Sequence, residues 1–200
     1  MTTARASVGA AEDPRRRKLL EAALSVFTRY GFRKTSMDEV ARAAQLSRQG
    51  LYLSFATKEE LFRASVQYFL ETALAAARAR LGDASLPIEA RLVGGFDEWI
   101  GRYVGMVGAD ASDLTQAGHD LVGPAVAEHE ELFALAVARV LRASGVMAAY
   151  KRAGLTARQL ADTLHATARG LKQGCRTRAA FVDAFTIAVR ALCAPLREEP

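Results

Sequence analysis

The 200-residue chain contains no long hydrophobic run. Its longest stretch without a charged residue is the nine residues 49–57, whereas a membrane-spanning helix needs roughly 18 apolar residues. The N-terminal segment has no apolar core ahead of the basic cluster at 15–18, which argues against a secretory signal. We therefore expect a cytoplasmic protein that has no membrane partner.

Cysteine and histidine are scarce as well. Cys175 and Cys193 lie far apart in helix-like segments, which favours reduced, partly buried thiols over a disulfide framework. These cysteines and His119, His129 and His165 show no metal-ligand spacing. Phosphate-binding glycine loops, nucleophile elbows and zinc-protease motifs are also missing. We therefore expect no cofactor, no metal and no enzyme activity.

The excess positive charge belongs to the first third of the chain. Residues 1–63 carry 12 Lys or Arg and 7 Asp or Glu, a net charge of +5, whereas residues 64–200 carry 15 of each and are neutral. A basic segment on a neutral body is typical of a polyanion-binding module joined to a second module. The alternative is that this charge only keeps a surface solvated.

The sequence predicts an all-α fold, because helix-forming residues dominate and no long run alternates apolar and polar residues. Residues 1–12 lack periodicity and are predicted to form a disordered tail. Ser36 and Thr57 each have a glutamate three residues on, which makes a capping box. The expected helix-capping residues are Asp13, Ser36, Ser47 and Thr57. The predicted helices are 14–30, 36–43, a short helix after 47, 57–81, 87–107, 112–119, 124–144, 156–174 and 177–194.

The second and third helices have the proportions of a helix-turn-helix, in which the later helix enters the DNA major groove. Arg48 and Gln49 stand at the start of the third helix, and their side chains suit guanine and adenine edges respectively. Gly50 costs about 1 kcal/mol of helix stability relative to alanine. A position without Cβ lets the helix backbone approach DNA closely, so we predict a DNA-reading surface here.

Residues 15–62, RRRKLLEAALSVFTRYGFRKTSMDEVARAAQLSRQGLYLSFATKEELF, resemble the DNA-binding domain of the TetR family of transcriptional regulators. The motifs that carry the resemblance are AA and F in the first helix, G before TS, VA in the second helix, S-x-x-x-LY in the third, and then F-x-x-KEEL. The resemblance implies a DNA-binding domain at 13–57 and a helical ligand-binding and dimerisation domain at 58–200.

The resemblance also implies which residues contact DNA, some in the groove and others at phosphates near helix starts. Gln45 stands in the turn where the family usually has glycine, and a left-handed backbone there would cost about 1 to 2 kcal/mol. Ser54 stands where the family often has histidine or tyrosine, so we expect a shorter contact or none. The implied DNA-contacting residues are Thr35, Ser36, Ser47, Arg48, Gln49, Gly50, Tyr52, Ser54 and Lys58.

The last two helices carry narrow apolar seams with steps of four and three residues. Such seams suit shallow helix packing, as in four-helix bundles. They fit either an intrachain core or a bundle made by two copies of the chain, and the family resemblance favours the homodimer. The predicted dimer-interface residues are Leu160, Leu164, Thr167, Leu171, Phe181, Phe185, Ala188 and Leu192.

An aromatic stripe runs along the segment 88–103 and fits either a core or an apolar small-molecule pocket with a few polar groups. If it forms a pocket, residues from later segments would close it. The predicted ligand-binding residues are Phe96, Trp99, Tyr103, Met106, His119, Met147, His165 and Phe185.

The leading hypothesis is a homodimeric repressor that binds a palindromic double-stranded DNA operator and is released by a small-molecule effector. A second hypothesis is a helical small-molecule-binding protein or enzyme whose basic segment is incidental. A third is an activator or nucleoid-type binder without an effector, which would bind DNA with a steep salt dependence and little sequence discrimination.

Overall fold

The computed structural model describes residues 13–106 and 111–194, and every regular element in these ranges is helical. This confirms the all-α prediction. Short 3-10 helices lie at η1 (Gly101–Tyr103) and η2 (Lys151–Ala153). The α-helices are α1 (Pro14–Tyr30), α2 (Met37–Ala43), α3 (Arg48–Ser54), α4 (Lys58–Gly82), α5 (Ile88–Trp99), α6 (Ala111–Ala143), α7 (Val146–Tyr150), α8 (Ala157–Gly174) and α9 (Arg178–Cys193).

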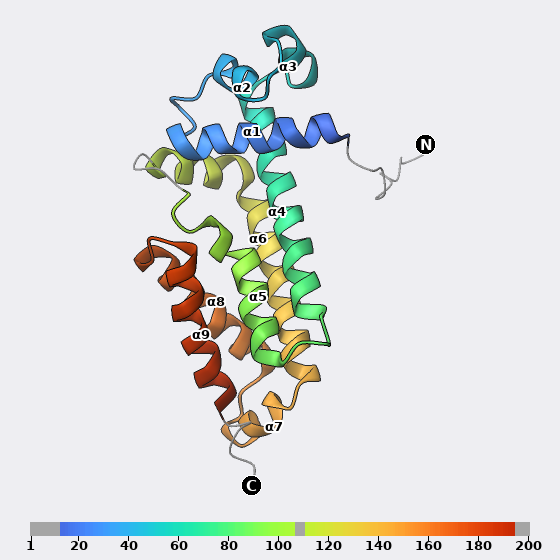
Figure 1. Ribbon diagram of the computed structural model, residues 1–200, viewed down its shortest axis with the longest axis vertical. Helices are drawn as coiled ribbons and strands as arrows, with labels where there is room; N and C mark the ends of the chain where they lie inside the picture. The colour runs from blue at the N-terminus through green and yellow to red at the C-terminus, as the bar shows by residue number, and fades with distance from the viewer. Residues whose placement is uncertain (1–12, 107–110, 195–200) are drawn as a thin grey trace.

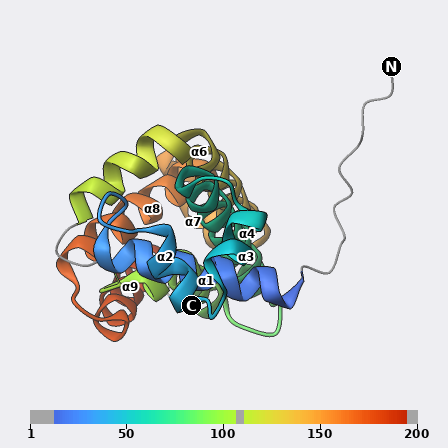
Figure 2. The same cartoon turned by 90° about the horizontal axis from the view of Figure 1, so that it is seen from above.

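The helices form a small module at one end of an elongated body. Figure 1 shows α1 lying across the upper end, with α2 and α3 above it and α4 running down from them. In the body, α4 packs against α5 and α6, α6 packs against α8, and α5 packs against α9. Figure 2 looks down on the α1–α3 end and shows the helices of the body grouped beneath it. The N-terminal module therefore sits at a tip of the molecule.

Local capping explains where the first four helices begin. Asp13 accepts a hydrogen bond from the backbone N–H of Arg15 at 3.0 Å. Ser36 forms both halves of the predicted capping box with Glu39. The side chains of Ser47 and Thr57 accept hydrogen bonds from the N–H groups three residues on. All four predicted N-caps are confirmed, because each depends only on residues close in sequence. The capping box predicted at Thr57 is only half formed, because the Glu60 carboxylate accepts from the Ala56 N–H at 3.0 Å instead of the Thr57 N–H.

The structure corrects the expected break near Pro124. Helix α6 runs from Ala111 to Ala143 with Pro124 inside it, although an internal proline costs about 3 kcal/mol. Val122 on one side of the proline and Phe133 and Val137 on the other are buried in hydrophobic clusters. Burying one such side chain contributes about 1.5 to 3 kcal/mol, so packing along the helix outweighs the proline. The segment after α6 also forms α7, where only a break was expected.

Two hydrophobic clusters share α4 and α6. The N-terminal cluster joins α1, α2 and α3 with Leu61 and Phe62 at the start of α4, and with Val122 of α6. The C-terminal cluster takes Leu70 further along α4 and Phe133 further along α6, together with α5, α8 and α9. The boundary predicted at 57/58 remains a prediction, but packing places the start of α4 in the N-terminal cluster. Two helices thus connect both ends of the molecule.

Within residues 13–106 and 111–194, no single helix is both long and apolar enough to cross a membrane. The segments 116–143 and 146–153 meet the length and composition requirements only as a pair, and they are bent by 89° at their junction. Cys175 is half-buried and Cys193 is buried, and both carry thiols. The predicted tail at 1–12 lies outside the described residues.

Candidate nucleic-acid interface and ligand cleft

Helix α3 has one face in the N-terminal cluster and one face in solvent. Leu51 and Phe55 anchor it, with 0% and 6% of their surfaces exposed. Arg48 and Gln49 are exposed at the first turn of α3, and Tyr52 is 41% exposed one turn later. The first turn of a recognition helix is where base-reading side chains are placed in helix-turn-helix proteins. The predicted reading residues therefore share one accessible face.

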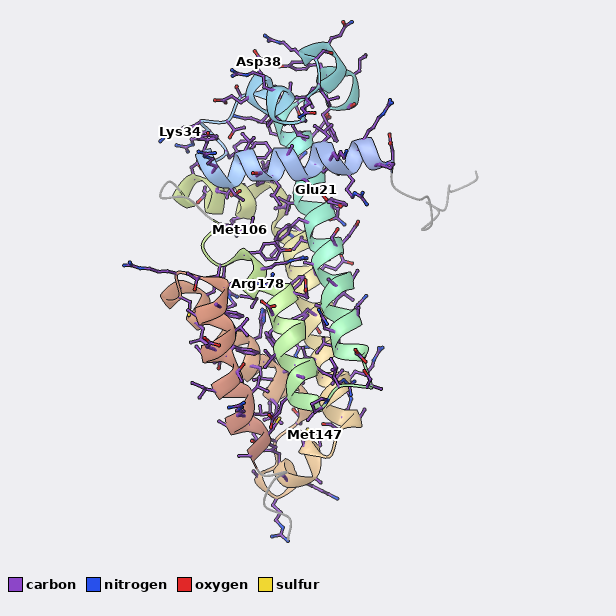
Figure 3. All side chains as sticks on the ribbon, viewed as in Figure 1. Glu21, Lys34, Asp38, Met106, Met147 and Arg178 are labelled. Atoms are coloured by element: carbon purple, nitrogen blue, oxygen red, sulfur yellow. The ribbon has the colours of Figure 1, made fainter. Side chains whose placement is uncertain are left out.

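Arg48 is held in place by α2. Its guanidinium lies 3.0 Å from the Asp38 carboxylate and 5.6 Å from the centre of the Tyr52 ring. Figure 3 labels Asp38 on α2, in the N-terminal module. The Arg48 side chain is 69% exposed, and an exposed ion pair contributes about 0 to 1 kcal/mol. Arg48 can therefore exchange Asp38 for another acceptor at little cost.

The turn between α2 and α3 is left-handed at Gln45, whose φ is +57°. Among the described residues it is the one non-glycine residue with positive φ. The backbone N–H groups of Gln45 and Leu46 donate to the carbonyls of Arg42 and Ala41, which closes the end of α2. The turn thus carries a strain of about 1 to 2 kcal/mol, as expected where glycine is replaced.

The lack of a side chain at Gly50 leaves room for the Ser47 cap of α3 and keeps the exposed face of α3 accessible. Its backbone N–H donates to the Ser47 hydroxyl at 3.0 Å. A Cβ at Gly50 would lie 3.1 Å from that same oxygen, so a larger residue would crowd the cap. Ser54, at the end of α3, is exposed and donates its hydroxyl proton to the Gly50 carbonyl at 3.3 Å.

Two arginines from the start of α1 lie beside the exposed face of α3, although sequence reasoning treated them only as part of a charge excess. Arg15 and Arg16 line a groove of about 300 Å³ with Gly50 and Ser54 of α3. The Arg16 guanidinium lies 5.0 Å from the centre of the Phe55 ring. Only the fold brings these positions together, since more than 30 residues separate them in the chain.

Two predicted phosphate contacts have structural partners instead. The Thr35 side chain is 2% exposed and donates its hydroxyl proton to the Gly31 carbonyl at 2.7 Å. The Lys58 ammonium donates to the carbonyls of Phe32, Arg33 and Thr35 at 2.9, 3.4 and 3.0 Å. Both side chains hold the α1–α2 connection together. Ser36 remains exposed, and its hydroxyl is engaged by Glu39.

Asp113 of α6 forms hydrogen bonds with the α1–α2 connection. The two carboxylate oxygens of Asp113 accept hydrogen bonds from the backbone N–H groups of Phe32 and Arg33, at 2.9 and 2.7 Å. Gly31 has a φ of +81°, and a Cβ there would collide with the Asp113 carboxylate. Residues 80 positions apart thus join the start of α6 to the N-terminal module.

A cleft of about 510 Å³ opens in the body between α4, the α5–η1 segment, α6 and α8. Aromatic and aliphatic side chains from α4, the α5–η1 segment and α6 make one wall, and polar side chains from α6 and α8 make the other. The apolar wall consists of Phe69, Leu70, Trp99, Ile100, Tyr103 and Val126. The polar wall consists of Glu130, His165, Arg169, Lys172 and Gln173.

Burial alters the charged state of the polar wall. Loss of hydration lowers the pKa of His165, which favours the neutral imidazole. It also lowers the pKa of Lys172, and the nearby Arg169 adds to that effect, although part of the Lys172 side chain remains exposed. Burial raises the pKa of the Tyr103 hydroxyl. Arg169 approaches Glu130 at 3.8 Å.

Three of the predicted ligand-binding residues, Trp99, Tyr103 and His165, line this cleft. Phe96 and Phe185 are fully buried in the C-terminal cluster, with their ring centres 4.6 Å apart. They belong to the core because their rings are enclosed by α5, α6 and α9 side chains. The aromatic stripe is therefore part core and part cleft wall.

The other three predicted ligand-binding residues lie elsewhere. Met106 is 52% exposed, and His119 is exposed on the part of α6 that packs against the N-terminal cluster. Met147, on α7, packs against the C-terminal cluster. Figure 3 shows Met147 at the far end of the body from α1–α3. Sequence reasoning missed Arg169 and Lys172, which line the cleft and follow His165 at steps of four and three residues along α8.

The predicted dimer seam faces inward. Leu160, Leu164, Phe181, Phe185 and Leu192 are all buried in the core of the chain itself. They are therefore unavailable to a second copy, and the intrachain alternative explains their spacing. The other three predicted interface residues, Thr167, Leu171 and Ala188, are half-buried.

The exposed side of α8 and α9 carries small or apolar residues among charged ones such as Asp183 and Arg190. On α8 it carries Thr163, Ala166 and Gly170, and on α9 it carries Ile187 with 70% of its surface exposed. Small residues let two helices approach closely. This outer face, which we define by these four residues, is the part of the last two helices that a partner can reach.

Comparison with known proteins agrees with the arrangement of α1 to α4. A family model described as "Bacterial regulatory proteins, tetR family" matches residues 19–65. The chain is also 41% identical over 63 residues to YfiR, an uncharacterized HTH-type transcriptional regulator of Bacillus subtilis (strain 168). That match covers 32% of this chain and 31% of YfiR, so it spans less than a third of the relative's length.

Solved structures extend the similarity to the whole fold. A TetR-like transcriptional regulator from Rhodococcus sp. RHA1 has 26% identity and a TM-score of 0.57, with 96% of this chain and 100% of that chain covered. The fatty acid degradation regulator FadR from Bacillus halodurans shares the fold with 16% identity and a TM-score of 0.71, over 95% and 100% of the two chains. Residues 19–65 therefore match the TetR family of bacterial regulatory proteins, and the chain shares its fold along almost its entire length with a solved TetR-like regulator.

Proposed function

We propose that this protein is a transcriptional repressor that binds a palindromic DNA operator as a homodimer and is released by a small-molecule effector. The observation that carries the proposal is the accessible face of α3, which presents Arg48 and Gln49 at the tip of the molecule. Phosphate contacts would come from the exposed arginines Arg15 and Arg16 beside α3. Contacts of that kind position a protein on DNA, while base contacts provide specificity.

The proposed dimer uses the outer face of α8 and α9, since their inner seam is occupied by the chain's own core. Ile187 would be the central apolar contact, because it is the most exposed large hydrophobic residue of the last two helices. A two-fold dimer places two copies of α3 on successive major-groove half-sites, which matches a palindromic operator.

The proposed effector site is the cleft of the body. Helices α4 and α6 extend from that cleft to the N-terminal module, and Asp113 fastens α6 to the α1–α2 connection. An effector can release DNA only if it binds the DNA-free arrangement more tightly than the DNA-bound one. Side chains of α4, α6 and α8 in contact with the effector offer a physical route for that difference.

A mobility-shift assay with DNA from upstream of the neighbouring genes tests the DNA-binding proposal. We expect the double variant Arg48→Ala/Gln49→Ala to lose about 30-fold or more in affinity, since each bidentate base contact provides about 1 to 3 kcal/mol of discrimination. Arg152→Ala, which removes an exposed arginine far from α3, serves as the matched control. Equal affinity of the double variant and the control would contradict the proposed readout.

A further inference from the structure

The two walls of the cleft differ in chemical character. Phe69 of α4 and Trp99 and Ile100 at the end of α5 belong to the apolar wall. Trp99 is 8% exposed, and the ring of Phe69 lies 4.2 Å from that of Tyr103, so this wall is closely packed. A surface of this kind favours the apolar part of a ligand, because contact removes hydrocarbon from water.

The polar wall has an excess of positive charge. His165, Arg169 and Lys172 follow one another along one face of α8, at steps of four and three residues. Among the described residues, Glu130 is the one carboxylate that lines the cleft, and it faces Arg169 at 3.8 Å. With a neutral His165, two cations and one carboxylate leave a net charge of +1.

Lys172 is the cation of the polar wall whose charge no described carboxylate neutralises. Within the described part of the chain no carboxylate pairs with its ammonium, and the residue is exposed beside the cation Arg169. Two neighbouring cations that share one carboxylate leave a positive charge that attracts an anion. An anionic group bound beside Arg169 and Lys172 would neutralise the excess charge. A cationic ligand would add to it, and a neutral ligand would leave it unchanged.

We propose that the cleft binds an amphiphilic anion, with its apolar body against Trp99 and Phe69 and one carboxylate or similar anionic group at Lys172 and Arg169. The cleft volume of about 510 Å³ lies within the range of small-molecule sites. This assignment rests on the proposed function in one respect, because it takes the ligand of this cleft to be the effector.

The only tryptophan of the chain reports directly on this cleft. The intrinsic fluorescence of Trp99 in the full-length protein can therefore be titrated with three probes of equal chain length: decanoate, decanol and decylamine. We expect decanoate to change the fluorescence at concentrations at least tenfold lower than decanol, and decylamine to bind more weakly than either. Decanol binding as tightly as decanoate, or no binding of decanoate, would overturn the proposal.

Two variants test where the anionic group sits. We expect Lys172→Met and Arg169→Gln each to weaken decanoate binding about tenfold and to leave decanol binding unchanged. Arg152→Gln, which removes an exposed cation far from the cleft, is the matched control and should bind decanoate like the natural protein. Unchanged thermal unfolding confirms that each variant is folded. Natural decanoate affinity in both folded variants would contradict the assignment.

The mobility-shift assay separates this inference from the proposed function. Fluorescence titration needs no DNA, so preferential decanoate binding that depends on Lys172 supports the anion site even if the protein fails to bind operator DNA. In that case only the proposed function would be contradicted, and the anion site would stand. Specific operator binding together with equal affinity for decanoate and decanol would overturn only the ligand class.

Discussion

At the scale of single residues, the α1–α2 connection depends on side chains that contact backbone groups. The ammonium group of Lys58 donates hydrogen bonds to three backbone carbonyls, and the Thr35 hydroxyl donates to a fourth. Sequence reasoning placed both residues near helix starts and assigned them to DNA. The carbonyls that Lys58 contacts lie 23 to 26 residues earlier in the chain, so local sequence gave no signal for them. The caps at Ser36 and Ser47 were predictable, since their partners lie three residues away.

Replacement of Lys58 by methionine tests the structural role. We expect Lys58→Met to lower the free energy of unfolding by about 1 to 3 kcal/mol, because the half-buried carbonyls of Phe32 and Thr35 lose a charged donor. Urea denaturation measures this change. Arg63→Met, at an exposed position of the same helix, should change stability by less than about 0.5 kcal/mol.

A different result would support the DNA contact predicted for Lys58. If Lys58→Met leaves urea unfolding unchanged but weakens DNA binding and reduces its salt dependence, then the ammonium neutralises a phosphate rather than joining the α1–α2 connection. Removal of one cation that neutralises a phosphate reduces the slope of log affinity against log salt by about one.

At the scale of whole helices, periodicity predicted the existence of most elements but not what their apolar faces contact. The seam of α8 and α9 has the same spacing whether it packs within one chain or between two. Only the surrounding helices α4, α5 and α6 show that the chain fills that seam itself. Likewise, Pro124 predicted a break because its cost is local, while the packing that offsets it involves distant residues.

The outer face of α8 and α9 makes a testable prediction about association. We expect Ile187→Glu to convert a dimer into a monomer with unchanged helix content, because 70% of this side chain is exposed in the single chain and a charge would oppose its burial. Light scattering after size exclusion measures the mass. Leu135→Glu, at a 44% exposed leucine on α6, should remain dimeric. A dimeric Ile187→Glu protein would refute this interface.

At the scale of the whole molecule, prediction from sequence is easiest where neighbours in the chain form one surface. Arg48 and Gln49 are adjacent and share an exposed face, whereas the cleft joins four separate segments and only three of its lining residues were predicted. Arg169 and Lys172 were missed because nothing in their local pattern distinguishes a cleft cation from a solvated one. The link between Asp113 and the α1–α2 connection spans 80 residues and has no sequence signal.

Asp113 should affect communication between the two ends of the protein. We expect Asp113→Asn to reduce the ratio of operator dissociation constants measured with and without decanoate by about threefold or more, which is within the range by which single substitutions change allosteric coupling. One amide oxygen cannot accept from both N–H groups as the carboxylate does. Asp120→Asn, on the exposed surface of the same helix, is the control. An unchanged ratio in Asp113→Asn would place the coupling elsewhere.

The sharing of α4 and α6 between two hydrophobic clusters has a consequence for denaturation. Neither cluster can lose its packing without breaking helices that the other needs, so the two ends of the chain should melt together. A calorimetric scan at fixed protein concentration should then give one heat-absorption peak, with equal calorimetric and van't Hoff enthalpies once association is taken into account. The helices that connect the proposed effector cleft to the DNA-reading end would thus also make the protein a single cooperative unit.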